Sequence, residues 1–141
     1  MIEWILQEAE IVRVSFSDDN QPYLVPMNFG YGENCIYLHS APEGRKIDIL
    51  KKNNRVCFQV DVHAQIVENA TPCNWGMHYF SVIGVGRAYF LDKIKDKKDS
   101  LDVIMKKYSS NSSFNYSEEE LKSVTVIKIE IDQLTGKKSG P

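Results

Sequence analysis

Short stretches in which apolar and polar residues alternate recur along the chain, and no other feature constrains its fold as strongly. Such alternation is typical of a β-strand that buries one face and exposes the other. Six segments carry this pattern or the composition of a strand, and the turn GEN separates two of them as in a hairpin. The predicted strands are residues 11–17, 23–31, 35–40, 55–63, 78–91 and 123–132.

Helical segments interrupt these strands without alternating with them. We expect a short lead-in helix within residues 1–9, a second helix over 45–52, and a third over 93–108, where apolar residues recur with helical spacing. Ser117 and Glu120 form a capping-box pattern that predicts a short fourth helix. Many short antiparallel strands with few helices predict a mainly β fold, a small closed or split barrel of about six strands.

Composition indicates one cytoplasmic domain over residues 1–141. The net charge of −2 leaves no overall basic surface, so nucleic acid is not an expected partner. The acidic N-terminus, MIEWILQEAE, does not resemble a signal peptide, and no stretch approaches the ~20 apolar residues of a membrane span. Cys35, Cys57 and Cys73 form no CxxC pair and no zinc-like ligand spacing, so we expect reduced thiols and no metal.

The segment HSAPEGRK places two cations at the start of the second predicted helix. A helix N-terminus carries about half a positive charge, so Arg45 and Lys46 are unfavourable there unless an anion lies in front of them. Unpaired backbone N–H groups, the two cations and the Ser40 hydroxyl would together hold a phosphate, and Gly44 lets the backbone approach closely. The alternative is that both cations point to solvent or pair with their acidic neighbours.

The run PYLVPMNFGY carries Pro26 inside an otherwise strand-like pattern. Proline cannot donate to a strand ladder, so the strand must be an edge or be bulged at this point. Backbone groups of Val25, Met27 and Asn28 would then be free for a planar ligand rich in donors and acceptors. The alternative is a plain sheet edge without a ligand.

Two other features bear on function. In GVGRA the GxG pattern is not followed by a helix, so it is not a dinucleotide fingerprint, and Gly84 and Gly86 instead predict a bend or bulge.

Residues 64–77 read as a long loop of the kind that often carries function, and His63 ends the strand beside it. Imidazole is the side chain best suited to proton transfer near neutral pH, which makes His63 the candidate proton donor.

Taken together, four segments resemble the pyridoxamine 5′-phosphate oxidase-related split barrels, and within them the Nim group, named for 5-nitroimidazole resistance. These segments are PYLVPMNFGY, YLHSAPEGRKIDILKKNNRVCFQVD, CNW and SVIGVGRAYF. The likeness runs from about Val12 to Gln133. It implies a six-stranded antiparallel split β-barrel, a homodimer, and FMN bound at the dimer interface.

The resemblance also assigns residues to the cofactor. It implies that Ser40, Arg45 and Lys46 hold the FMN phosphate, and His39 and Gly44 of the same segment are further expected cofactor-binding residues. The isoalloxazine is expected along the strand that reads Val25-Pro26-Met27-Asn28. The FMN phosphate would then be the anion in front of Arg45 and Lys46.

The chain departs from the family pattern in two places. Relatives often carry an arginine before SVIG, where this chain has Phe80. The ending TGKKSGP lacks the Arg-Leu-Xaa-Pro type ending with which true pyridoxamine phosphate oxidases bind their substrate. Oxidation of vitamin B6 is therefore not the expected activity.

Three functions remain open at the level of sequence. The first is an FMN-dependent oxidoreductase that reduces nitro groups of a small nitroaromatic substrate, with His63 as proton donor and Trp75 lining the pocket. The second is a flavin- or haem-binding module for storage or sensing. The third is an empty barrel that serves as an interaction scaffold. The colour of the purified protein separates the third from the others, and electron transfer to an acceptor separates the first from the second.

Overall fold

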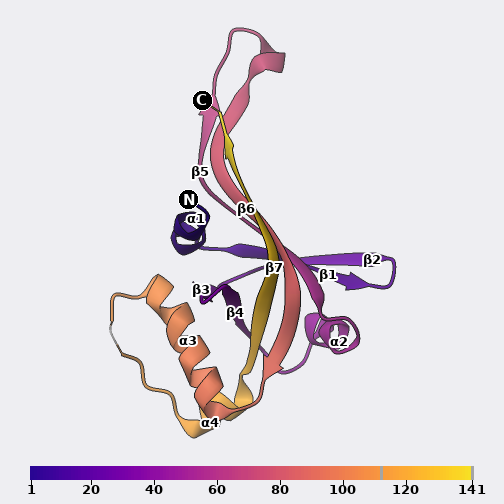
Figure 1. Cartoon of the computed structure of the whole chain (residues 1–141), viewed down its shortest axis with the longest axis vertical. Coiled ribbons are helices and arrows are strands. Elements are labelled where there is room, and N and C mark those ends of the chain that lie inside the picture. The colour runs from indigo at the N-terminus through magenta and orange to yellow at the C-terminus, as the bar shows by residue number, and fades with distance from the viewer. Residues whose placement is uncertain (112, 141) are drawn as a thin grey trace.

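The computed structural model describes residues 1–111 and 113–140, in which seven strands form one antiparallel sheet in the order β2-β1-β5-β6-β7-β4-β3 (Figure 1). The strands are β1 (Val12–Asp18), β2 (Gln21–Met27), β3 (Gly30–Gly32), β4 (Cys35–Ser40), β5 (Arg55–Val67), β6 (Gly76–Leu91) and β7 (Thr125–Ser139). The helices are α1 (Ile2–Glu8), α2 (Arg45–Lys52), α3 (Ile94–Tyr108) and α4 (Glu118–Ser123), with a short 3₁₀ turn at Pro72–Asn74. Among these described residues, no helix is long and apolar enough to cross a membrane.

The sheet has seven strands where six were predicted. The single strand expected over residues 23–31 is two strands, because the chain leaves β2 after Met27 and pairs again as β3 at the opposite edge of the sheet. Between the two strands, Phe29 is fully buried and its backbone N–H donates to the Tyr108 hydroxyl at 2.9 Å. This bond to α3 replaces a strand partner, and it explains why the run is interrupted.

β5 and β6 form a long hairpin arm that projects from the body of the protein (Figure 1). The loop predicted over residues 64–77 is therefore shorter than expected and spans 68–75, because β5 continues to Val67 and β6 begins at Gly76. Most side chains near the tip of the arm are exposed, so no alternation in the sequence marks this part of the hairpin. β7 also runs further than predicted, to Ser139, and pairs with β6 along the base of the arm.

The main core lies on one face of the sheet and a second, smaller cluster on the other, because the consecutive β7 residues Val126 and Ile127 are both buried. Val14, Phe58 and Val60, which come from the neighbouring strands β1 and β5, are at most 1% exposed. α1 and α2 add apolar side chains to the same cluster, and α3 forms a second cluster through Leu101 and Ile104. Each buried side chain of this size stabilises the fold by ~1.5–3 kcal/mol, so the inner face of the sheet dominates stability.

Lys107 of α3 fastens the end of α1 to the body. Its Nζ donates to the carbonyls of Leu6, Gln7 and Ala9 at 2.7, 2.9 and 2.8 Å and lies 4.2 Å from the ring centroid of Phe29. These carbonyls lie at the C-terminus of α1, where a helix leaves acceptors without intrahelical partners. Burial lowers the pKa of Lys107 to about 8, because partial removal from water disfavours the charged ammonium.

Candidate functional site

The junction between β4 and α2 leaves backbone donors at the start of the helix. α2 begins at Arg45, as predicted, and its N-cap is Gly44, whose φ of 139° strongly favours glycine. Gly44 offers no side chain, and no other side chain caps this helix start. The first-turn N–H groups therefore stay available to an anion, as the sequence suggested.

The two cations at this junction are not neutralised by neighbouring acids. Among the ion pairs of the described residues, none includes Arg45 or Lys46, so the alternative of local pairing is not observed. Instead the Arg45 guanidinium lies 4.4 Å from the ring centroid of Tyr23 on β2. Lys46 is half-buried, and the Ser40 hydroxyl donates to the Ala41 carbonyl at 2.7 Å. Ser40 therefore lies in the same short connection but already has one partner.

β2 is an edge strand, in agreement with the position of Pro26. It pairs with β1 on one side and has no neighbour on the other among the described residues, so backbone groups along Val25, Pro26 and Met27 are open to a ligand. Asn28 follows the strand and is exposed. Because Arg45 stacks on Tyr23 of this same strand, the structure brings the helix start and the open edge together.

His39 is the member of the predicted phosphate segment whose placement differs. It lies in β4 one residue before Ser40, is exposed, and pairs in register with Val126 of β7. Consecutive strand residues point to opposite faces of a sheet, so the His39 and Ser40 side chains diverge. The His39 side chain therefore points away from the side of the sheet on which Ser40 lies.

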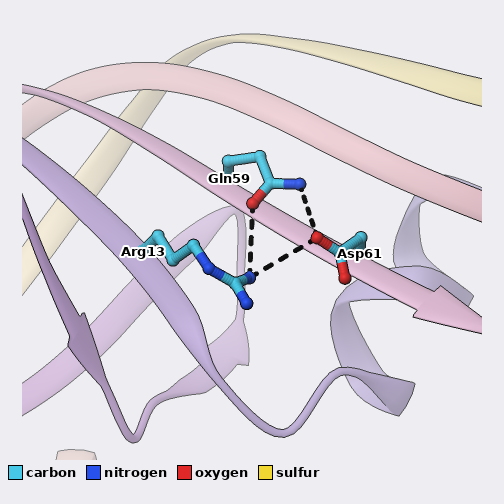
Figure 2. Close-up of polar contacts among 3 residues, drawn as sticks. All are labelled: Arg13, Gln59 and Asp61. Carbon is cyan, nitrogen blue, oxygen red and sulfur yellow. Dashed lines mark hydrogen bonds and ion pairs between the residues drawn. The ribbon is translucent and has the colours of Figure 1, made fainter. Parts of the chain in front are cut away.

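A polar network that the sequence did not reveal lies on the outer face of the sheet (Figure 2). The Arg13 guanidinium lies 3.4 Å from Gln59 Oε1 and 3.5 Å from Asp61 Oδ2, and Gln59 Nε2 donates to the same Asp61 oxygen at 2.9 Å. Arg13 is paired in register with Pro26, so the network adjoins the open edge strand. The alternation of apolar and polar residues predicts that these side chains face outward. Only the pairing of β1 with β5 shows that Arg13 lies beside Gln59.

Next to this network, α1 and the root of the arm enclose a cavity of about 330 Å³. Charged groups line it from three elements, namely Glu8, Glu10, Arg13, Asp61 and His63. Three carboxylates and one guanidinium line the cavity, so it does not suit a phosphate. It is a polar recess beside β1, distinct from the start of α2.

His63 lies inside β5, not at the end of a strand beside a long loop as predicted. The β5–β6 register shifts between Val62 and Gln65, and His63 has a φ of 56°, a left-handed conformation that costs a non-glycine residue roughly 1–2 kcal/mol. Backbone strain of this kind is common at functional positions, so it supports His63 as a candidate functional residue. Both the bulge and the exposed hairpin beyond it were invisible in the sequence.

Side chains from α1 and β6 hold the His63 ring. Nε2 of His63 lies 3.5 Å from Glu8 Oε1, and the rings of Trp4 and Phe80 meet the imidazole edge-on, with centroids 5.4 and 6.5 Å away. Trp4 and Glu8 are four residues apart and so share one face of α1. Sequence reasoning missed both residues, although this spacing was the available signal.

Trp75 lies at the tip of the arm, directly after the 3₁₀ turn. Its Nε1 donates to the Asn69 carbonyl at 2.6 Å, and 51% of the residue is exposed. The tip projects away from the body that carries α2 (Figure 1). Within one chain, Trp75 and Arg45 therefore do not share a pocket.

Comparisons with known proteins agree with this architecture. A solved protein from Bacteroides thetaiotaomicron, provisionally assigned to 5-nitroimidazole antibiotic resistance, is 38% identical, with a TM-score of 0.86 over 96% of this chain and 80% of that one. An FAD-binding protein from Mesorhizobium loti is 26% identical, with a TM-score of 0.72 over 98% of this chain and 92% of that one. An uncharacterised protein of Rhizobium meliloti is 32% identical over 40% of this chain and 36% of its own length.

The family relationship extends over nearly all of the chain. The sequence profile of the pyridoxamine 5′-phosphate oxidase family matches residues 2–138. The seven-stranded sheet with its flanking helices is the split-barrel fold of these proteins. The chain belongs to the pyridoxamine 5′-phosphate oxidase family of split-barrel proteins.

Proposed function

We propose that this protein is an FMN-dependent oxidoreductase that reduces the nitro group of small nitroaromatic compounds. The observation that carries the proposal is the uncapped start of α2, where Arg45 and Lys46 have no acidic partner, joined through Tyr23 to the open edge of β2. A phosphate and a planar ring with donors and acceptors would each find matching groups there. The 38% identical relative assigned to nitroimidazole resistance supports the choice of substrate class.

The residues of the junction fit a flavin phosphate. Arg45 and Lys46 provide two positive charges, the first turn of α2 provides backbone N–H donors, and the Ser40 hydroxyl lies in the same connection. The edge of β2 from Val25 to Asn28 is the place for the ring system. Bound FMN would supply the electron-transfer chemistry, and the chain would position it and exclude water.

A second copy of the chain would complete the site. Beside the edge of β2 and along the arm, large apolar side chains are exposed, with Leu24 60%, Ile83 49% and Ile66 61% accessible. Such a surface is typical of one that is covered by a partner. A homodimer would cover it and would bring Trp75 of one copy toward the flavin of the other, which one chain alone does not allow.

His63 is the proton donor in this proposal. Reduction of a nitro group consumes protons as well as electrons, so a positioned acid is needed beside the substrate. The strained backbone of His63 and its contacts with Glu8 and Trp4 support a fixed role for the imidazole.

Anaerobic stopped-flow spectroscopy tests the function directly. Protein loaded with FMN is reduced chemically and mixed with a 5-nitroimidazole, and the return of the oxidised flavin spectrum is followed. The proposal predicts reoxidation that saturates with nitroimidazole concentration and is faster than that of free reduced FMN. Reoxidation no faster than that of free FMN would leave a flavin-binding module without this activity.

A further inference from the structure

The root of the β5–β6 arm contains a cavity with no residue of α2 or β2 in its lining. Its volume is about 320 Å³, and β5, β6 and the end of β7 contribute its walls. The side chains that give it chemical character are His63, His78 and Lys138, with the rings of Tyr79 and Phe80. No carboxylate is among the residues that line it.

Each imidazole has one ring nitrogen occupied by an acceptor of the protein. His63 Nε2 faces Glu8 Oε1 at 3.5 Å, and His78 Nδ1 lies 3.4 Å from the Ser139 carbonyl, which can only accept. These contacts leave Nδ1 of His63 and Nε2 of His78 for another partner. When an imidazole is protonated, its remaining nitrogen is a donor, so the pair is suited to binding an anion.

The lysines near the cavity add positive charge. Lys138 lines it and lies 6.0 Å from the ring centroid of Phe80, and Lys137 lies 5.6 Å from that of Tyr79 without lining the cavity. On its other side His63 meets Glu8 and borders the recess that Glu10, Asp61 and Arg13 also line. The balance of these groups is positive when the imidazoles are protonated.

Gly140, the residue that follows β7, lies close to the His78 ring. Gly140 has a φ of 94°, and a Cβ built there would lie 1.6 Å from His78 Nδ1. A residue with a side chain cannot occupy this position without displacing the imidazole. The chain therefore passes directly over the ring, which fixes one wall of the cavity.

We propose that this cavity binds an anionic group, a carboxylate or a phosphate, through His63, His78 and Lys138. Tyr79 and Phe80 give it aromatic walls that would accommodate a planar ring attached to the anion. The described residues contain no group of three or more His, Cys, Asp or Glu side chains placed to hold a metal ion, so two imidazoles with a lysine favour an anion. The site shares His63 with the proposed proton transfer, but it uses none of the residues assigned to the flavin phosphate.

Imidazole NMR tests this site with an internal control. Protein saturated with FMN, or as purified if it binds none, is titrated at pH 6 with benzoate and separately with inorganic phosphate. The chain has three histidines, and His39 lies on β4 outside the cavity. We expect the ring signals of His63 and His78 to shift with one saturating curve, while the His39 signals do not follow that curve. Tighter binding of benzoate would identify a planar carboxylate as the ligand class, and tighter binding of phosphate a phosphoryl group.

Two lysine variants separate a defined site from general positive charge. Lys138→Ala should raise the dissociation constant for the anion about tenfold, since it removes a charge-assisted bond. Lys137→Ala makes the same change in net charge one residue away and should raise that constant less than about twofold. Equal losses in both variants, or no shift of the His63 and His78 signals at the highest soluble anion concentration, would overturn the proposal. Unchanged circular dichroism confirms that each variant is folded.

Discussion

The guanidinium of Arg45 lies 4.4 Å above the ring centroid of Tyr23, so the first residue of α2 is held against the edge strand β2. A cation over an aromatic face contributes about 0.5–1 kcal/mol at an exposed site. The guanidinium carries five N–H donors, and the ion pairs of the described residues use none of them, so these donors remain for an anion. This contact links the two halves of the proposed flavin site, the uncapped helix start and the open strand edge.

Arg45→Ala should weaken FMN binding by about 10- to 100-fold, because a charge-assisted bond to phosphate contributes about 1.5–3 kcal/mol. Fluorescence quenching of added FMN measures the dissociation constant. Arg55→Ala is the matched control, because Arg55 is also exposed and lies at the start of β5, beyond the end of α2. An Arg45 variant that binds FMN as tightly as the Arg55 variant would show that Arg45 is only a surface residue.

His63→Ala should slow reoxidation of the reduced flavin by a nitroimidazole about 100-fold, the typical effect of losing a positioned acid. Reoxidation by oxygen should change far less, since it depends less on a fixed proton donor. Gln65→Ala, two residues further along β5, controls for disturbance of the bulge. If the His63 variant slows both acceptors alike, the imidazole has no specific role in proton transfer.

The protein should be a homodimer, and Ile83→Lys should dissociate it. Ile83 is 49% exposed on the outer face of β6, and a lysine there would bury a charge within the proposed interface. Ile94→Lys makes the same substitution on α3, at a residue that is 37% exposed, and should leave the dimer intact. Light scattering at micromolar concentration checks both variants. A monomeric unmodified protein with FMN bound contradicts the proposed interface.

Lys107→Met should destabilise the fold in a pH-dependent manner. At any pH it leaves the carbonyls at the end of α1 without their donor, a cost of about 1–3 kcal/mol. Burial lowers the pKa of Lys107 to about 8 from the ordinary 10.5, so between these values the folded state has released a proton that the unfolded state still binds. Through this group, raising the pH across that window favours folding of the unmodified protein.

The difference in unfolding free energy between the unmodified protein and Lys107→Met should therefore increase as the pH rises from about 8 to about 10.5. Urea denaturation followed by circular dichroism at several pH values measures it. Lys106→Met, the exposed neighbour on α3, should show little loss at any pH. A difference that stays constant across the window would mean that burial does not perturb the titration of Lys107.

Local sequence signals determined much of the fold. The start of α2 at Arg45 was predictable because the strand before it ends in a glycine-containing turn, and the capping box at Ser117 and Glu120 is present as expected. The edge position of β2 followed from Pro26, which cannot donate to a second neighbour. In each case a single residue type limits the backbone, and the limit is visible in the sequence.

The remaining features depend on contacts between distant residues. The break between β2 and β3 depends on Phe29, whose N–H finds its acceptor in Tyr108, 79 residues further along. The extension of the arm was hidden because its side chains are exposed on both faces, and exposure removes the alternation that marks a strand. Glu8 meets His63 only because α1 packs beside the bulge of β5.

The central claim is that the start of α2 holds the phosphate of a flavin, and the relative affinity for FMN and riboflavin tests it most directly. The two ligands share the isoalloxazine and differ by the phosphate, so their affinity ratio isolates the contribution of Arg45, Lys46 and the helix start. Quenching titrations at one ionic strength should show FMN binding about 100-fold more tightly, with most of that ratio lost in Arg45→Ala. FAD, titrated in parallel, shows whether a longer ligand is accepted. Equal affinity for FMN and riboflavin would contradict the account.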